Sequence, residues 1–215
     1  FNPVPGVVHK YQGRALLIAA GHCAINCRYC FRRHYPYSDQ KRARSEWQHS
    51  LRYIEKHPDI EEIILSGGDP LALTDGQVFE LITAIEAIPH IKRLRIHSRL
   101  PIVLPQRISL TLCQRLAHSP LNCVMVVHAN HANELGLDVA QACALLRQHQ
   151  VQLLNQSVLL ANVNDTLTCL MELSERLFEL GIMPYYLHLP DHVAGTTHFF
   201  VSLKRGQSLV AKMQA

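Results

Sequence analysis

Short runs of β-branched and aliphatic residues alternate along the chain with longer segments in which apolar positions recur at helical spacing. The short runs predict six strands, at Ala15–Ala19, Glu62–Leu65, Arg93–Ile96, Asn122–Val127, Val151–Gln156 and Met183–Leu187. The longer segments predict helices at Ser45–His57, Asp75–Ile88, Leu110–His118, Asp138–Gln148 and Thr166–Leu180. Ser45 and Asp75 are suited to cap helix starts, and Gly181 to end the last helix.

Strict alternation of strand and helix predicts an α/β fold in which crossover helices join parallel strands. Six strands are too few for a closed eight-stranded barrel, so we expect an open, partial (β/α)6 barrel like part of a TIM barrel. The chain has no repeat, low-complexity tract or linker, and we expect a single domain over residues 1–215. Within it, we expect a leading arm over residues 1–13, the barrel over 14–190, and the start of an incomplete C-terminal segment over 191–215.

Polar clusters follow every predicted strand. In chain order they are Cys23–Cys30, Ser66–Pro70, His97–Arg99, His128–His131, Gln156 with Ser157, and His188 with Asp191. The carboxyl ends of parallel strands meet at one rim, and ligands of such folds bind there. The sequence therefore predicts a site at this rim.

Composition narrows the class of protein. A length of 215 residues with 48% hydrophobic and 18% charged residues fits one globular domain and excludes a disordered chain. The net charge of +4 permits anionic ligands without requiring nucleic acid. The chain lacks an apolar run of membrane-spanning length and a signal-peptide pattern. We expect no nucleic-acid or membrane partner. The first residue is Phe1 and not Met, which suggests a fragment.

Three of the seven cysteines crowd into one short stretch, with the spacing Cys23-x3-Cys27-x2-Cys30. Three thiolates can hold three irons of a [4Fe–4S] cluster and leave the fourth iron open to a small molecule. A zinc site is the alternative, with His22 or His34 as fourth ligand. A redox dithiol would leave one cysteine unexplained.

The other four cysteines, Cys113, Cys123, Cys143 and Cys169, sit singly in apolar stretches. We expect them to be buried small hydrophobes. The pattern indicates a reducing, cytoplasmic compartment.

The cysteine loop, with Tyr29 before its last cysteine, is typical of the radical S-adenosylmethionine (SAM) superfamily. Further segments resemble the lysine 2,3-aminomutase family, and within it the branch that makes (R)-β-lysine for modification of elongation factor P. These segments are Cys27–Arg33, Leu65–Leu71, Arg95–Pro101, Leu154–Leu160 and Pro184–His188. The resemblance runs from about His9 to Val201 and implies a partial barrel of the radical SAM type.

In that family, SAM chelates the open iron and is cleaved to a radical that takes a hydrogen from the substrate. The resemblance implies that Cys23, Cys27 and Cys30 hold the cluster. It also implies a SAM site, in which two glycines allow close approach and a carboxylate suits the amino group of SAM. The residues that match this site are Gly67, Gly68, Asp69, Ser98, Arg99, His128 and Gln156. A simple turn at the glycines and a structural salt bridge at Arg99 remain alternatives.

The second cofactor of the family is pyridoxal 5′-phosphate (PLP). Lys10 and Arg14 match the residues that grip its phosphate. Arg32 matches the residue that binds the substrate carboxylate, and Asp191 the residue that meets the lysine ammonium. His188 stands where lysine 2,3-aminomutases carry Tyr and the elongation-factor branch carries His.

No lysine of this chain matches the family's PLP-anchoring residue, because neither Lys204 nor Lys212 lies in the glycine-rich context of that residue. We therefore assign no catalytic residue and expect the anchor outside this sequence.

The resemblance thus implies an isomerase, a lysine 2,3-aminomutase that converts L-lysine to (R)-β-lysine. It would need an external one-electron reductant, and a separate ligase would pass its product to elongation factor P. One alternative is a radical SAM enzyme without PLP that acts on a protein or an RNA. Another is a binding module stabilised by zinc or a cluster, but this leaves the other rim motifs unexplained.

Overall fold

A computed structural model describes residues 1–32 and 44–214 of the chain. It contains one curved sheet whose strands follow chain order from edge to edge. They are β1 (Val7–Tyr11), β2 (Arg14–Ala20), β3 (Glu62–Gly67), β4 (Arg93–His97), β5 (Asn122–Val127), β6 (Gln152–Val158) and β7 (Met183–His188). Strands β2 to β7 run parallel to one another, so the expected partial barrel is confirmed.

The leading arm contains a strand that the sequence reasoning missed. Strand β1 pairs antiparallel with β2, with Val7 opposite Leu17 and Tyr11 opposite Arg14. The two residues between Tyr11 and Arg14 close the hairpin, and Gly13 adopts a φ of 82° there. A two-residue hairpin turn favours such a glycine, so Gln12-Gly13 was the available signal.

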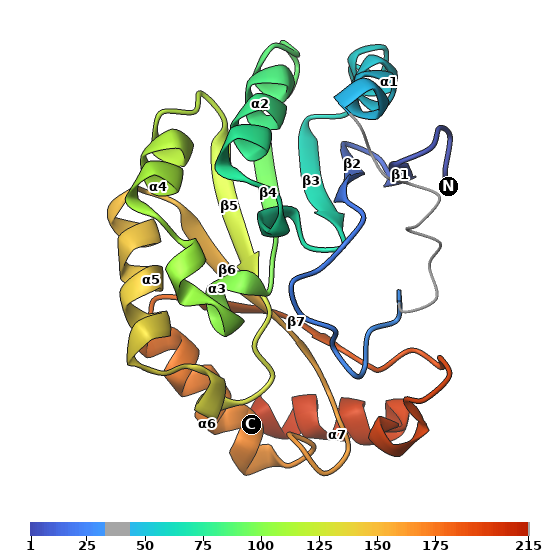
Figure 1. The fold of residues 1–215 in the computed structure, drawn as a ribbon. Coiled ribbons are helices and arrows are strands. Elements are labelled where there is room, and N and C mark those ends of the chain that lie inside the picture. The colour runs from blue at the N-terminus through green and yellow to red at the C-terminus, as the bar shows by residue number, and fades with distance from the viewer. Residues whose placement is uncertain (33–43, 215) are drawn as a thin grey trace.

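The helices cover the outer face of the sheet (Figure 1). They are α1 (Arg44–Glu55), α2 (Asp75–Glu86), α3 (Leu100–Val103), α4 (Leu110–Ala117), α5 (Leu137–Gln148), α6 (Leu167–Glu179) and α7 (Leu203–Met213). The five predicted helices are all present. The short α3 was not predicted, and neither were the 3-10 turns η2 (Pro70–Ala72), η3 (Pro105–Arg107), η4 (Ala132–Glu134) and η5 (Thr197–Phe199).

Both predicted helix caps were misplaced. Ser45 lies inside α1. Thr74, and not Asp75, caps α2, because its hydroxyl accepts from the Gln77 amide in a capping box. Asp75 instead pairs with Arg107, with 2.6 Å between carboxylate and guanidinium. Gly181 follows the C-terminal cap of α6 with a φ of 68°, as expected.

Alternation along the strands divides the barrel into a packed outside and a polar inside. In β4, Leu94 and Ile96 are buried in the core between sheet and helices, whereas Arg93, Arg95 and His97 take the other face. A second, smaller core of Leu159, Leu170, Val201 and Leu209 joins α7 to α6 and to the end of β6. Of the four single cysteines, Cys113 and Cys143 are buried as expected, but Cys123 and Cys169 are only half-buried. No helix in the described ranges is long and apolar enough to span a membrane.

Candidate functional site

A cavity of about 500 Å³ opens at the carboxyl ends of the parallel strands. Its lining includes most of the residues singled out from the sequence: Cys23, Cys27, Cys30, Arg32, Gly67, Gly68, Asp69, Ser98, Arg99, His128, Gln156, His188 and Asp191. Lys10 and Arg14 do not line it. The rim expected from the sequence is therefore one continuous surface.

Gly67 and Gly68, at the end of β3, let the segment between β2 and the first cysteine of the triplet lie against them. The amide of Gly68 donates to the carbonyl of Ala20 at 2.8 Å, and that of Asp69 donates to the carbonyl of His22 at 2.9 Å. A Cβ at Gly68 would lie 2.1 Å from the His22 carbonyl oxygen, and one at Gly67 would lie 2.5 Å from that of Ala20. Both glycines also line the cavity, so the close approach between the two backbone segments lies beside the place where a ligand would bind.

The three thiols of the loop lie on the wall of the cavity, with Cys23 exposed and Cys27 and Cys30 half-buried. Within residues 1–32 and 44–214, no three His, Cys, Asp or Glu side chains converge to hold a metal ion. His34, one of the two candidates for a fourth zinc ligand, lies outside the described residues. Three thiols on the wall of one cavity can supply three ligands to a [4Fe–4S] cluster.

The carboxylate of Asp69 is buried and accepts hydrogen bonds from three neighbouring residues. Its Oδ1 accepts from the Leu71 amide at 2.9 Å and from the Ser98 hydroxyl at 2.7 Å, and its Oδ2 accepts from the Arg99 amide at 2.8 Å. Burial raises the pKa of the carboxyl, and these hydrogen bonds act against that rise. Asp69 and Ser98 therefore fix the end of β3 to the end of β4.

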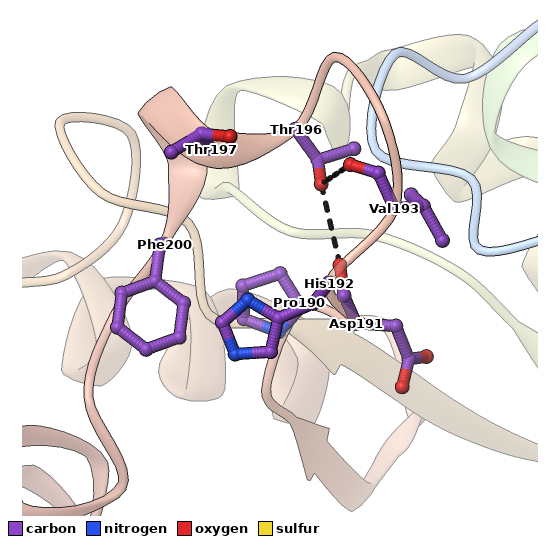
Figure 2. Close-up of a pocket in the computed structure, with 7 residues that line it drawn as sticks. All are labelled: Pro190, Asp191, His192, Val193, Thr196, Thr197 and Phe200. Atoms are coloured by element: carbon purple, nitrogen blue, oxygen red, sulfur yellow. Dashed lines mark hydrogen bonds between the residues drawn. The ribbon is translucent and has the colours of Figure 1, made fainter.

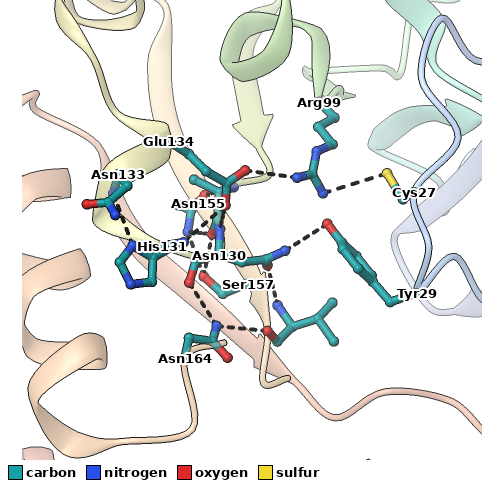
Figure 3. A network of polar contacts seen from close by, with 12 residues as sticks. Cys27, Tyr29, Arg99, Asn130, His131, Asn133, Glu134, Asn155, Ser157 and Asn164 are labelled. Carbon is teal, nitrogen blue, oxygen red and sulfur yellow. Dashed lines mark hydrogen bonds and ion pairs between the residues drawn. The ribbon is translucent and has the colours of Figure 1, made fainter. Parts of the chain in front are cut away.

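Arg99 forms the salt bridge that we had kept as an alternative. One guanidinium nitrogen donates to Glu134 at 2.8 Å, and another donates to the sulfur of Cys27 at 3.6 Å (Figure 3). In the same network Asn130 donates to the hydroxyl of Tyr29 at 2.7 Å. The cysteine loop is thus tied at two points to the loop that follows β5.

Two histidines at the rim carry unsatisfied nitrogen atoms. The Nε2 atoms of His97 and His128 are buried and have no hydrogen-bond partner among the described residues. Burial, with help from neighbouring cationic groups, lowers the pKa of each to about 3. Both rings are therefore neutral at pH 7, and their free nitrogens suit a polar ligand in the cavity.

Arg32, His188 and Asp191 occupy the other part of the cavity wall. Arg32 donates to the Ser66 hydroxyl at 3.0 Å and to the Gly67 carbonyl at 2.7 Å through a single nitrogen. Burial lowers the pKa of His188, and the nearby Asp191 acts in the opposite direction.

Asp191 also borders a second pocket of about 200 Å³ in the loop after β7. Figure 2 shows its carboxylate pointing away from the rings of His192 and Phe200. This side chain therefore faces away from the aromatic part of the small pocket.

Lys10 and Arg14 converge on one ring of the β1–β2 hairpin. Lys10 Nζ lies 5.1 Å from the centroid of Tyr11, and the Arg14 guanidinium lies 4.9 Å from it. Two cations held near one ring form a positive surface that suits an anion such as a phosphate.

Sequence reasoning missed an ion pair inside the barrel. Arg95 donates to Glu62 at 2.8 Å and to the hydroxyl of Tyr185 at 3.0 Å, and so joins β3 and β4 to β7. The signal was present, because Arg93, Arg95 and His97 alternate with apolar residues in a strand of an otherwise buried sheet. Glu134 was also missed, since its role depends on a contact between distant loops.

Comparison with known proteins decides the family. Residues 17–165 match the radical SAM superfamily. The chain belongs to this superfamily. Among solved radical SAM structures, Streptococcus suis SuiB bound to S-adenosylmethionine has a TM-score of 0.69 at 16% identity, over 95% of this chain and 47% of SuiB. That likeness confirms the fold.

Curated radical SAM relatives confirm the resemblance to lysine 2,3-aminomutases. The L-lysine 2,3-aminomutase of Escherichia coli (strain K12) is 52% identical over 210 residues, which are 98% of this chain and 61% of the relative. That of Haemophilus influenzae is 52% identical over 201 residues, 94% of this chain and 60% of the relative. The chain therefore spans about three fifths of the length of these two relatives.

Membership in the radical SAM superfamily implies SAM and a [4Fe–4S] cluster, and the cavity fits both. Three thiols line one side of it, and unsatisfied imidazole nitrogens of His97 and His128 lie within its wall. A buried polar atom without a partner is costly, so these two nitrogens would each gain a hydrogen bond from a polar ligand bound in the cavity.

Proposed function

We propose that this chain carries the radical SAM core of an isomerase that converts L-lysine to (R)-β-lysine and uses PLP as its second cofactor. An external reductant supplies one electron, and the product serves the modification of elongation factor P through a separate ligase in the reducing cytoplasm. The observation that carries the proposal is the single cavity lined by the cysteine triplet, Arg32 and Asp191, in a chain 52% identical to L-lysine 2,3-aminomutases. The elongation-factor step rests on the motif resemblance alone.

The proposed substrate, L-lysine, is supported by the charges of two side chains on the cavity wall. Free lysine carries a carboxylate at one end and an ammonium on its side chain. Arg32 uses one nitrogen for its two hydrogen bonds, so other donors of its guanidinium remain for a carboxylate. The carboxylate of Asp191 accepts no hydrogen bond from the described residues and suits the ammonium. A glutamate substrate would place a second negative charge near Asp191.

The proposed binding of the cluster and SAM is supported by the other residues that line the cavity. When bound, the cluster and SAM supply a carbon-centred radical that removes a hydrogen atom from the substrate. Cys23, Cys27 and Cys30 hold the cluster, and His128 and Gln156 contact SAM. The neutral His128 can accept or donate a hydrogen bond without adding charge beside the cationic cofactor.

The hairpin of β1 and β2 supports the PLP part of the proposal. Lys10 and Arg14 lie against Tyr11 and offer a paired positive surface to the phosphate of PLP. PLP, when bound, would supply a delocalised ring that stabilises the unpaired electron while the amino group migrates. The chain's own task here is to hold that ring by its phosphate and so orient it toward the cavity.

The proposal is tested on the full-length protein, reconstituted anaerobically with iron, sulfide and PLP and supplied with dithionite, SAM and L-lysine. β-Lysine is measured by chiral chromatography. We expect (R)-β-lysine only with all components present. We expect Arg32→Lys and Asp191→Asn each to raise KM for lysine at least about tenfold, since the first removes the planar guanidinium fork and the second removes the negative charge. Glu175→Gln, an exposed position on α6, is the matched control.

Each outcome has a distinct meaning. If Cys27→Ser still turns over lysine, the cluster assignment is wrong. If SAM is cleaved but lysine is not converted, the radical SAM core stands and the aminomutase proposal is refuted. A protein or RNA substrate without PLP is then the next hypothesis.

A further inference from the structure

A buried polar network beside the cysteine loop reaches one thiol of the triplet. Arg99 leaves the end of β4 and donates from one guanidinium nitrogen to the sulfur of Cys27 at 3.6 Å. Its other terminal nitrogen donates to Glu134 Oε2 at 2.8 Å (Figure 3). The guanidinium therefore lies between a carboxylate and a sulfur that the proposed function assigns to the cluster.

Glu134 is itself held firmly. Its Oε1 accepts from the amide of Asn130 at 2.7 Å and from that of His131 at 3.1 Å, which fixes the carboxylate at the start of η4. Asn130 is fixed in turn, because its Oδ1 accepts from the Val158 amide at 2.8 Å and its carbonyl accepts from Asn164 at 2.8 Å. The carboxylate that faces Arg99 is thus oriented before any cofactor binds.

Two further contacts, one of them made by its backbone amide, also hold Arg99 in place. Its amide donates to Asp69 at 2.8 Å, and its guanidinium lies 5.3 Å from the ring centroid of Tyr29. The side chains of Arg99 and Glu134 are only 20% and 24% exposed. Contacts this sheltered are weakly screened by water and salt, so the charge of Arg99 acts on the nearby sulfur.

We propose that Arg99 is a hydrogen-bond donor to the cluster-ligating sulfur of Cys27, that Glu134 is the positioning residue that holds it there, and that this pair raises the reduction potential of the cluster. A donor to a ligating thiolate withdraws electron density and stabilises the more negative, reduced state of the cluster. Such partners around the ligands are among the means by which proteins set cluster potentials.

Because Arg99 and Glu134 carry opposite charges, the direction in which the reduction potential changes in Glu134 variants tests the proposal. If Glu134 acted only by its charge, its neutralisation would favour the reduced cluster and raise the potential. If Glu134 acts by holding Arg99, its loss lets the guanidinium move from Cys27, and the potential falls. Glu134→Asp keeps the charge and shortens the reach by one methylene, so only the positioning role predicts a fall in that variant.

The experiment is a redox titration of the reconstituted full-length protein, monitored by electron paramagnetic resonance. Dithionite supplies the single electron that reduces each oxidised cluster. SAM is left out, so an effect of Arg99 on SAM binding does not enter. Iron and sulfide content per chain are measured first, and only variants with a full cluster are titrated.

We expect Arg99→Gln to lower the ratio of reduced to oxidised cluster at a fixed solution potential about tenfold, which is about 59 mV for a one-electron couple. Glu134→Gln and Glu134→Asp shift the potential in the same direction by less. Glu86→Gln is the matched control, because Glu86 makes a similar ion pair with Arg115 at 2.7 Å away from the cavity. It leaves the potential unchanged.

The inference rests on the cluster site of the proposed function, and the two fail differently. Absence of any cluster signal in the unaltered protein refutes the cluster site itself. An unshifted potential in fully loaded Arg99→Gln overturns the donor role, and a rise in either Glu134 variant overturns the positioning role. If one Glu134 variant does not load, the other and Arg99→Gln still decide the question.

Discussion

Gly68→Ala is the substitution for which the structure gives the sharpest expectation. The added methyl carbon would lie 2.1 Å from the carbonyl oxygen of His22 and 2.7 Å from its amide nitrogen. Both are backbone atoms, so no side chain can rotate away to make room. The segment that begins the cysteine loop has to move by about 1 Å to restore an ordinary contact distance.

The cost follows from what that movement breaks. The hydrogen bond from Asp69 to His22, now 2.9 Å long, is lost at about 1 kcal/mol, and residual overpacking adds roughly 1–3 kcal/mol. The lower end of the combined loss, about 2 kcal/mol, already lowers Tm by about 4–8 °C in a chain of this size. Because the loop carries the cysteine triplet, we also expect a large loss of bound iron and sulfide.

Gly76→Ala is the control, since a Cβ at Gly76 meets nothing within 4 Å and the residue lies in the first turn of α2. It should keep the full cluster and leave stability unchanged or raise it by up to about 1 kcal/mol. Iron and sulfide content after anaerobic reconstitution and Tm by circular dichroism measure both effects. A Gly68→Ala protein with a full cluster and an unchanged Tm would refute the reasoning.

Two further predictions concern stability. Burial lowers the pKa of His97 and of His128 to about 3, below the ordinary 6.5. The folded state therefore keeps both rings neutral, and its stability is complete above pH 6.5 and falls as the pH drops below that value. At pH 5, each histidine lowers the free energy of unfolding by about 2 kcal/mol. Denaturant titrations of the cofactor-free protein at pH 7 and pH 5 measure this, and a double His97→Gln, His128→Gln variant should lose most of the dependence. Thr74→Ala removes the cap of α2 and should lower the free energy of unfolding by about 1 kcal/mol, read from the same titrations; equal stability would contradict the cap.

Local pattern was enough to determine the barrel. Each parallel strand is a short aliphatic run followed by a helical segment, and this alternation leaves few topologies because crossovers are right-handed and neighbouring strands pair in order. The rim was predictable for the same reason, since a residue that follows a parallel strand lies at the carboxyl edge of the sheet wherever the helices pack. The cysteine spacing and the segments Leu65–Leu71 and Leu154–Leu160 then narrowed the family.

The tertiary structure decided which partner each rim residue takes. Asp69 lines the cavity as expected, and only the structure shows that its carboxylate also accepts hydrogen bonds from residues that follow β3 and β4. Arg99 reaches both Cys27 and Glu134, which are 72 and 35 residues away in sequence. Gly67 and Gly68 were recognised as sites of close approach, and only the structure shows that the backbone of Ala20 and His22 is among what approaches them. Periodicity and spacing report which face or edge a residue occupies, whereas a contact between two loops depends on where both strands end in space, and that is set by the packing of the whole sheet.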